Sequence, residues 1–153
     1  MIRIIEYKDQ YHVAFKALNL EWLDQYHLTE SHDLMILDDP KGTILDRGGY
    51  IWLALDDEQG QVVGTAALIH EHDNCYELAK MSVAPAFRGK GISKLLIEQC
   101  LTTAREIGAG KLILYSNSQL QTALRLYSQY GFQHVPVTDA PFVTADVKME
   151  LRF

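Results

Sequence analysis

The stretch from Glu77 to Lys94 constrains the fold of this chain more than any other. Residues 75–83 alternate apolar and polar side chains, which predicts a β-strand. The strand ends at Pro85, because proline cannot donate to a strand ladder. Two glycines then lead into the clearest helix pattern of the chain, over residues 91–107, which stops at Gly108. The chain therefore places a glycine-rich turn between the end of a strand and the start of a helix.

This turn has the chemistry of an anion-binding site. The first turn of a helix presents free backbone N–H groups, and the helix dipole adds about half a positive charge. Gly89 and Gly91 carry no Cβ, so a ligand oxygen can approach the backbone closely. Arg88, Lys90 and Lys94 add cationic side chains. The pattern predicts a phosphate or pyrophosphate ligand.

Two common phosphate-binding patterns are excluded. The P-loop requires a lysine followed by serine or threonine after a longer glycine spacing, which is absent. The dinucleotide fingerprint requires a third glycine where Lys94 stands. It also requires an acid about twenty residues later, where the chain has Lys111 and apolar neighbours.

What remains is the pattern Arg-x-x-Gly-x-Ser, from Arg88 to Ser93. It resembles the acetyl-CoA pyrophosphate loop of the GNAT superfamily of N-acetyltransferases, whose pattern is Gln/Arg-x-x-Gly-x-Gly/Ala. Ser93 departs from the last position, but it is small. Residues 123–132, Ala-Leu-Arg-Leu-Tyr-Ser-Gln-Tyr-Gly-Phe, resemble the second signature of the family, a helix ending in Leu-Tyr and followed by Gly-Phe. The resemblance covers residues 50–135 and implies an N-acetyltransferase enzyme.

Composition excludes several other classes of protein. The chain has 153 residues, enough for one domain with a sizeable core, and we expect a single domain over residues 1–153. The net charge of −6 argues against a nucleic-acid surface. The sequence shows neither an apolar run of membrane-spanning length nor a signal peptide, so we expect no membrane partner. Cys75 and Cys100 have no metal or redox spacing, which predicts a reducing, cytoplasmic location.

The helical and strand patterns predict an α/β (α+β) fold, with a mixed, mainly antiparallel sheet of six to seven strands flanked by about four helices. The element order matches the GNAT fold. The fifth strand follows a helical crossover, so it should run parallel to its partner. The predicted strands cover residues 2–6, 50–55, 62–70, 75–83, 112–115, 132–137 and 143–151. The predicted helices cover residues 9–27 with Asp9 as N-cap, 34–37 with Thr29 or Ser31 as N-cap, 91–107 and 119–130. Residues 38–42 are predicted as a turn and residues 43–49 as irregular.

The resemblance also implies how acetyl-CoA would bind. In the family the fourth and fifth strands separate, and the pantetheine arm of the cofactor fills the gap like a strand. Here the backbone of Met81 and Val83 would bond to the pantetheine amides, and the N–H of Met81 would polarise the thioester carbonyl. The predicted cofactor-binding residues are Met81, Ser82, Val83, Arg88, Gly89, Lys90, Gly91, Ile92, Ser93, Lys94, Asn117, Leu120, Ala123, Leu124 and Tyr127.

Acetyl transfer to an amine requires a base for the ammonium group and profits from an acid for the departing thiolate. Glu77 is the predicted base, because it shares strand parity with apolar residues and stands where many relatives place a glutamate. The alternative is a polar residue at a strand end, and the other candidate bases are His70, Glu71 and His72. The two histidines have no evident third metal ligand, so we predict no metal site. Tyr127 is the predicted acid and matches the tyrosine of the family, although a buried aromatic stripe would also explain it.

The distribution of charge in the sequence bears on the acceptor pocket. Between Ala17 and Pro40 the chain has no lysine or arginine, and an acidic pole there would suit a cationic amine. Acids on helix faces that only keep the protein soluble are the alternative. The acids are Glu21, Asp24, Glu30, Asp33, Asp38 and Asp39. In relatives the first helices, the hairpin turn and the final loop form this pocket, so the resemblance implies as acceptor residues Glu21, Tyr26, His27, His32, Asp33, Tyr50 and Phe142.

The sequence thus predicts direct acetyl transfer from acetyl-CoA to a primary amine of a small, cationic molecule, without an acyl-enzyme. Two alternatives stay open: an acyl-CoA sensor without activity, and an acetyltransferase acting on a protein or peptide. The oligomeric state is also open, with a homodimer as the alternative to a monomer.

Overall fold

Seven strands form one sheet, in the order β1-β2-β3-β4-β5-β7-β6, in the computed structural model, which describes residues 1–153. All neighbouring strands are antiparallel except β4 and β5, which run parallel as predicted. The strands are β1 (Ile2–Glu6), β2 (Tyr50–Asp56), β3 (Gln61–His72), β4 (Cys75–Val83), β5 (Lys111–Ser116), β6 (Gln133–Val135) and β7 (Val147–Arg152).

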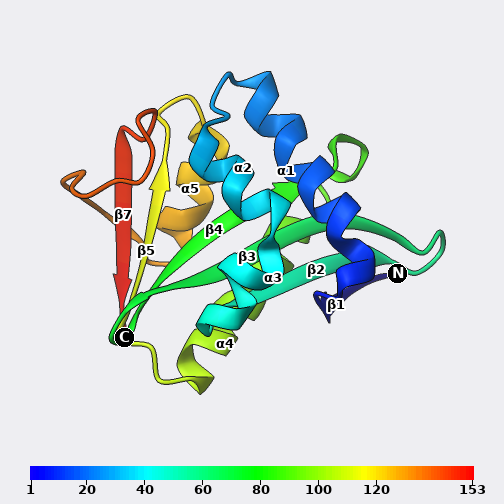
Figure 1. The fold of residues 1–153 in the computed structure, drawn as a ribbon, viewed down its shortest axis with the longest axis horizontal. Helices are drawn as coiled ribbons and strands as arrows, with labels where there is room; N and C mark the ends of the chain where they lie inside the picture. The colour runs from blue at the N-terminus through cyan, green and yellow to red at the C-terminus, as the bar shows by residue number, and fades with distance from the viewer.

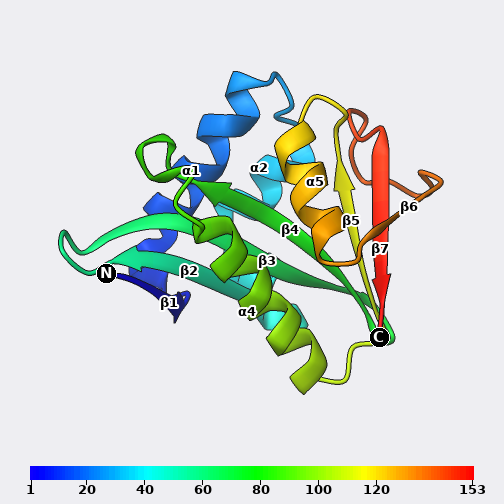
Figure 2. The ribbon, with the colours of Figure 1, turned by 180° about the vertical axis from the view of Figure 1, so that it is seen from behind.

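Helices cover both faces of this sheet, which confirms the predicted fold class (Figures 1 and 2). One face carries α1 (His12–Gln25), α2 (Ser31–Asp38) and α3 (Pro40–Thr43), and the other carries α4 (Ile92–Glu106) and α5 (Gln121–Gln129). Each face buries its own apolar core, one around Phe15 and Leu53 and the other around Leu68 and Leu96. No helix combines the length and the apolar character that a membrane crossing requires.

Strands β4 and β5 pair over only three residues. The paired positions run from Cys75 opposite Lys111 to Glu77 opposite Ile113. Beyond them β4 keeps its pairing with β3, and β5 keeps its pairing with β7. The two strands therefore separate after Glu77, as the family resemblance implied, and the facing edge of β4 has no strand partner from Leu78 onward.

A β-bulge interrupts β4 at Lys80, which the sequence pattern did not predict. Thr65 lies opposite Ser82 and Ala67 opposite Ala79, so β4 has one extra residue in this interval. Lys80 is the extra residue, with a φ of 53°. The hydroxyl of Thr65 donates to its carbonyl oxygen at 2.7 Å, so the irregular backbone keeps a hydrogen bond.

The bulge corrects the predicted faces of β4. Strict alternation placed Lys80 and Ser82 on the face opposite Glu77. In the structure the Lys80 ammonium reaches Asp33 of α2, and the Ser82 hydroxyl donates to the carbonyl oxygen of Leu18 in α1. Both side chains thus lie toward α1 and α2.

The predicted helix boundaries near the N-terminus are corrected at three places. Residues 9–11 form a separate 3-10 turn, and α1 begins only at His12. The N-cap of α2 is Glu30, whose side chain and that of Asp33 form a capping box. The predicted turn at residues 38–42 contains the start of α3, and a 3-10 turn follows within the segment predicted as irregular.

The prediction of a last strand over residues 143–151 is wrong in its first part, because β7 begins at Val147. The first two N–H groups of this segment donate to the carboxylate of Glu30, at 2.8 and 2.9 Å. The carbonyl oxygen of Thr144 accepts from the side chain of Asn117 at 2.8 Å. These partners come from distant parts of the chain, so alternation alone could not show that the segment is a loop.

Candidate active site

A cleft of about 570 Å³ opens where β4 and β5 separate. Its walls come from α1, α2, β4, the loop before α4, β5, α5 and the segment 142–145. The glycine-rich loop lies at this cleft, and so do Glu77 and Tyr127. Residues that are far apart in the sequence therefore meet around one hollow.

The loop before α4 offers free hydrogen-bond donors. The backbone N–H groups of residues 89–94 donate no hydrogen bond within the protein. Gly91, the N-cap of α4, has a φ of 79°, and Gly89 has a φ of 76°. Nothing lies within 4 Å of a Cβ built on either glycine. The loop can thus receive an anionic group against its backbone, which is the geometry the sequence predicted for a diphosphate.

The first residue of the loop motif is held by the protein itself. The Nε of Arg88 donates to the carbonyl oxygen of Val83 at 3.1 Å. Its Nη2 donates to the carboxylate of Glu21 in α1 at 2.9 Å. This pair is half-exposed and connects α1 to the loop.

Most of the predicted cofactor-binding residues line the cleft, and two do not. Lys90 is not part of the lining, and its ammonium lies 5.0 Å from the centre of the Phe87 ring. Leu124 is buried in the core beneath α5. The predicted residues that line the cleft are Met81, Ser82, Val83, Arg88, Gly89, Gly91, Ile92, Ser93, Lys94, Asn117, Leu120, Ala123 and Tyr127.

Glu77 is a buried acid in the wall of the cleft. Only 4% of its surface is exposed, and it is the last residue of β4 that pairs with β5. Burial, followed by a hydrogen bond and the charge of Glu71, raises its pKa from 4.5 to about 8. A carboxyl with a pKa near neutrality suits a general base.

Tyr127 lines the cleft from α5 as a half-buried residue. Its ring packs edge-on against Phe132, with the ring centres 6.0 Å apart. Burial raises the pKa of the phenol to about 12, so it keeps its proton across the neutral range. Tyr130, by contrast, donates its hydroxyl to Glu98 at the surface, at 3.1 Å.

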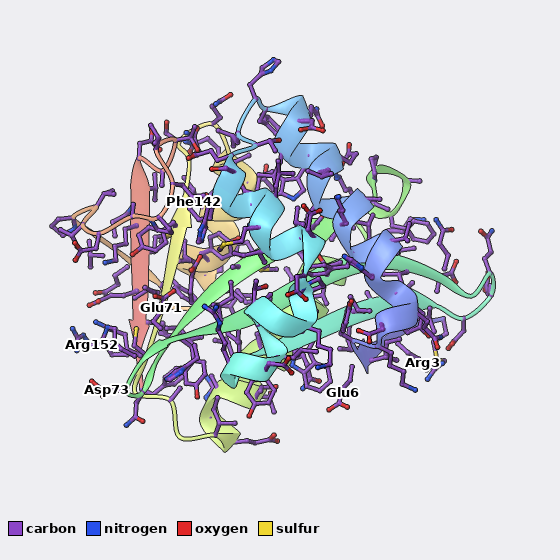
Figure 3. The ribbon with its side chains drawn as sticks, viewed as in Figure 1. Arg3, Glu6, Glu71, Asp73, Phe142 and Arg152 are labelled. Atoms are coloured by element: carbon purple, nitrogen blue, oxygen red, sulfur yellow. The ribbon has the colours of Figure 1, made fainter.

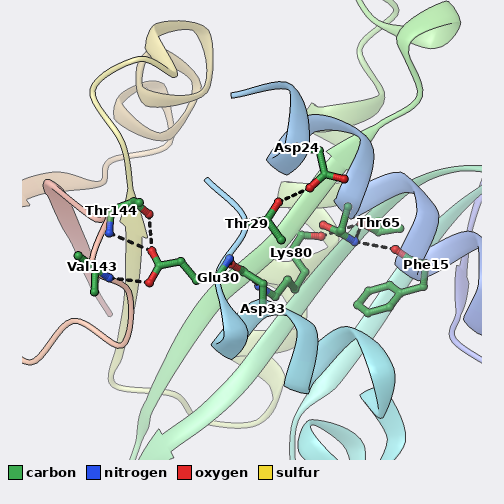
Figure 4. Close-up of polar contacts among 10 residues, drawn as sticks. Phe15, Asp24, Thr29, Glu30, Asp33, Thr65, Lys80, Val143 and Thr144 are labelled. Carbon is green, nitrogen blue, oxygen red and sulfur yellow. Dashed lines mark hydrogen bonds and ion pairs between the residues drawn. The ribbon is translucent and has the colours of Figure 1, made fainter. Parts of the chain in front are cut away.

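A buried ion pair that the sequence did not reveal crosses the acceptor end of the cleft (Figure 4). The Nζ of Lys80 donates to Oδ1 of Asp33 at 2.6 Å, and the two side chains are 5% and 3% exposed. The ammonium also lies 5.2 Å from the centre of the Phe142 ring, against which His32 packs edge-on. Burial and the Lys80 charge lower the pKa of His32, so its ring favours the neutral form. In the sequence, the one sign of this ion pair was that Lys80 is the only charged residue after Glu77 in the predicted strand.

Replacing Asp33 with asparagine is expected to destabilise the protein by about 3–5 kcal/mol, because the Lys80 ammonium would stay buried without a counter-charge. The double variant Asp33→Asn/Lys80→Met should recover most of this loss. Asp38→Asn, which removes the charge from the exposed pair with Lys16, should cost about 1 kcal/mol or less. Urea unfolding of the three variants measures these differences. Equal stability of the two single variants would contradict the buried pair.

Glu30 fixes the segment that closes the acceptor end. One carboxylate oxygen accepts from the N–H of Val143, and the other accepts from both the N–H and the hydroxyl of Thr144 (Figure 4). These bonds lower the pKa of Glu30 despite the opposing effect of burial, so the carboxylate stays ionised. The N-terminus of α2 and the segment carrying Phe142 are thereby held together.

The structure brings only part of the predicted acceptor set to the cleft. Tyr26, Asp33 and Phe142 line it. Four others are not among the lining residues: Glu21 is paired with Arg88, the exposed His27 follows α1 with a φ of 56°, His32 packs edge-on against Phe142, and Tyr50 packs against the core. Their contact with the acceptor stays a prediction.

The acidic run between residues 17 and 40 is largely occupied by contacts within the protein. Its members serve as ion-pair partners, helix caps or loop anchors, so they do not form a free acidic pole. The contacts are Glu21 with Arg88, Asp24 with Thr29, Glu30 with the N–H groups of Val143 and Thr144, Asp33 with Lys80, Asp38 with Lys16, and Asp39 with the N–H of Gly42.

Comparison with known proteins identifies a family and relatives that are similar in sequence to this chain. A family model described as the acetyltransferase (GNAT) family matches residues 12–132. The N-acetylaspartate synthetase of Rattus norvegicus is 40% identical over 93 residues, which cover 60% of this chain but only 30% of that protein. The uncharacterized N-acetyltransferase YjgM of Escherichia coli K12 is 32% identical over 118 residues, which cover 72% of this chain and 70% of that protein.

Solved structures share the fold over the whole chain. An acetyltransferase of the GNAT family from Staphylococcus aureus Mu50 superposes with a TM-score of 0.91 at 24% identity, covering 99% of each chain. The PaiA N-acetyltransferase of Thermoplasma acidophilum, solved in complex with coenzyme A, superposes with a TM-score of 0.77 at 17% identity. That match covers 100% of this chain and 99% of the other.

Proposed function

The chain belongs to the acetyltransferase (GNAT) family, and we propose that it transfers the acetyl group of acetyl-CoA directly to a primary amine of a small molecule. The observation that carries this proposal is the meeting of three features at one cleft. These are the unbonded amides of residues 89–94, the buried acid Glu77 and the protonated phenol of Tyr127.

The residues present suit acetyl-CoA as the donor. The free N–H groups and the open space at Gly89 and Gly91 match the needs of a diphosphate, and Lys94 adds a cationic side chain at the same end of the cleft. The unpaired edge of β4 near Met81 and Val83 offers backbone groups to the pantetheine arm. Bound acetyl-CoA supplies the acetyl group as a thioester.

The side chains divide the proton chemistry between them. The Glu77 carboxylate takes a proton from the acceptor ammonium, because only the neutral amine has a lone pair for attack. The backbone N–H of Met81 donates to the carbonyl oxygen as negative charge develops on it. Tyr127 holds its proton on Oη, gives it to the departing sulfur, and regains a proton from the attacking nitrogen, which loses one as the amide forms. Neither cysteine takes part: both are buried and Cys75 lies on the paired part of β4, so no acyl-enzyme is proposed.

The proposal includes a preference for an acceptor that carries positive charge. A small cationic amine was predicted from the acidic run, but those acids have partners within the protein. What still supports a cationic acceptor is the aromatic lining from Trp22, Tyr26 and Phe142, whose rings can cover a cation.

A second acceptor class is an amino acid, whose amine would approach Glu77 while its carboxylate approaches Lys80. The observation that favours it is the buried ammonium of Lys80 in the cleft lining, which has one hydrogen-bond acceptor, Asp33. The likeness to a protein named N-acetylaspartate synthetase also supports it, although the chain covers only 30% of that relative.

The experiment that tests the function is thiol release from acetyl-CoA across a panel of acceptors. The panel holds polyamines, aminoglycosides, neutral and acidic amino acids, and basic peptides. Acceptor-dependent release is expected with a small amine. Tight acetyl-CoA binding without release for any acceptor would favour an acyl-CoA sensor, and release with peptides alone would favour a protein acetyltransferase.

The reducing interior of the cell is the compartment that we propose for this enzyme. Cys75 and Cys100 are both buried as free thiols, and no disulfide is formed. This supports the predicted cytoplasmic location, since disulfides are favoured in oxidising compartments.

Replacing Tyr127 with phenylalanine is expected to lower kcat by about tenfold or more, because the departing thiolate would lose its proton donor. The KM for acetyl-CoA should change by less than about twofold, since the ring and its packing remain. Tyr130→Phe, which loses only the surface bond to Glu98, is the matched control and should keep the normal kcat. Steady-state kinetics decide the matter, and a normal kcat in Tyr127→Phe would remove its role as the acid.

A further inference from the structure

The carboxyl group of Glu71 lies beside Glu77 but takes no part in the proton transfers proposed for Glu77 and Tyr127. Ile69 lies opposite Glu77 and His70 opposite Tyr76, but the next paired residue of β3 is His72. Glu71 is therefore the extra residue of a second bulge, on β3. Ile69 and Glu77 lie opposite each other and share a face of the sheet, and Glu71 reaches the Glu77 carboxyl from the bulge two residues further along β3.

The two carboxyl groups are hydrogen-bonded to each other, and they differ in exposure. Glu77 is 4% exposed in the cleft wall, whereas Glu71 is exposed to solvent near the β3–β4 turn (Figure 3). A bond between two carboxyls requires a proton on one of them. Because burial and the charge of Glu71 raise the pKa of Glu77, Glu77 is the protonated partner at neutral pH and donates to the Glu71 carboxylate.

The other charged and titratable groups near the pair come from three elements. They are Lys80 on β4, Asp33 and His32 on α2, and Tyr115 on β5. Lys80 lowers the pKa of Glu77 and Asp33 raises it, but these two groups are paired with each other at 2.6 Å, so their effects largely oppose. The pKa of Tyr115 is raised to about 12 by burial and by the charge of Glu77, so its phenol stays neutral. Glu71 is thus the group of this cluster that joins Glu77 to solvent.

We propose that Glu71 is a positioning residue that relays protons between the buried base Glu77 and bulk water. This inference rests on the proposed role of Glu77. Before each turnover the Glu77 proton passes to the Glu71 carboxylate and then to water, which leaves Glu77 ionised. Glu77 next takes one proton from the acceptor ammonium, which restores its protonated starting state, and that proton leaves by the same route at the start of the next turnover. Each cycle releases this one proton to solvent, and both carboxyls return to their starting state.

The test is the pH dependence of kcat and kcat/KM in Glu71→Gln, whose carboxamide keeps the shape but carries neither the charge nor a transferable proton. The midpoint of the kcat/KM profile, expected at about 8 in the natural protein, should fall by about one unit or more. At pH values above the midpoint, kcat in dilute buffer should fall by about fivefold or more, and added imidazole should restore it. An unchanged midpoint, or a kcat that does not depend on buffer concentration, would overturn the relay.

Asp73→Asn is the matched control, because it removes one exposed carboxylate two residues away in the same turn (Figure 3). It should leave both the midpoint and the buffer dependence as they are. Carbon-13 NMR titration of the glutamate carboxyls, without substrates, gives a readout that does not depend on turnover. The Glu77 resonance should titrate at lower pH in Glu71→Gln than in the natural protein.

The variants Glu77→Gln and Glu71→Gln distinguish a wrong relay from a wrong base assignment. If Glu77→Gln keeps full activity, the base assignment falls and the relay falls with it. If Glu77→Gln is inactive but Glu71→Gln matches the natural protein in profile and NMR midpoint, the relay alone is refuted.

Discussion

Gly91→Asp is expected to weaken acetyl-CoA binding by about 100-fold or more, because it places a negative charge against the diphosphate at the N-terminus of α4. Two unit charges about 4 Å apart repel by about 1–4 kcal/mol near a protein surface, which is the scale of this loss. Aspartate tolerates the left-handed backbone better than most residues, and nothing lies within 4 Å of its Cβ position. The variant should therefore fold, and isothermal titration calorimetry with acetyl-CoA measures the effect.

Two controls separate the charge from the backbone strain. Gly91→Asn has the same shape without the charge, so it should bind more tightly than Gly91→Asp. Gly60→Asp adds an acid at another left-handed glycine, in the β2–β3 turn, where the Cβ position is also open, and it should bind normally. Normal affinity in a folded Gly91→Asp protein would contradict the proposal that this loop holds the diphosphate.

Glu77→Gln is expected to lower kcat by about 100-fold or more, since a carboxamide cannot take a proton from the acceptor. In the natural protein kcat/KM should rise with pH through about 8, because Glu77 acts as a base only when ionised. The variant should lose this inflection. Glu106→Gln, an exposed acid at the end of α4, is the control and should keep it. An inflection that survives in Glu77→Gln would assign the base to another group.

The same substitution should change how stability depends on pH. The pKa of Glu77 is higher in the folded state than the ordinary value of 4.5, so proton binding favours the folded protein. This stabilisation is complete below pH 4.5 and is lost as the pH rises through about 8. Urea unfolding at pH 6 and pH 9 should show a smaller difference in Glu77→Gln than in the natural protein.

Local sequence patterns predicted the main helices and strands of the fold. The spacing of apolar residues in 91–107 predicted α4, because this spacing gives a helix one apolar face that can pack against the core. The crossover after it predicted the parallel strand β5. The glycine-rich motif predicted a loop with free amides, because the first turn of any helix leaves its N–H groups without partners.

Long-range contacts explain where the sequence interpretation was wrong. Leu124 and Tyr50 follow local patterns that suit a cleft as well as a core; the structure buries Leu124 in the core and packs the half-buried Tyr50 against it. The segment 143–146 alternates like a strand, but Glu30 takes up its N–H groups. The acids of α1 and α2 look free in the sequence, and their partners lie elsewhere in the fold.

By itself the sequence determined the order of the elements, the amide-rich loop and the family, because each depends on residues that are close together in the chain. The tertiary structure decided which groups share the cleft. The bulge at Lys80 turns its ammonium toward Asp33, and a second bulge brings Glu71 to Glu77. An extra residue in one strand changes the face of every side chain after it, and whether the sheet accepts one depends on the neighbouring strand and helix, which no local pattern records.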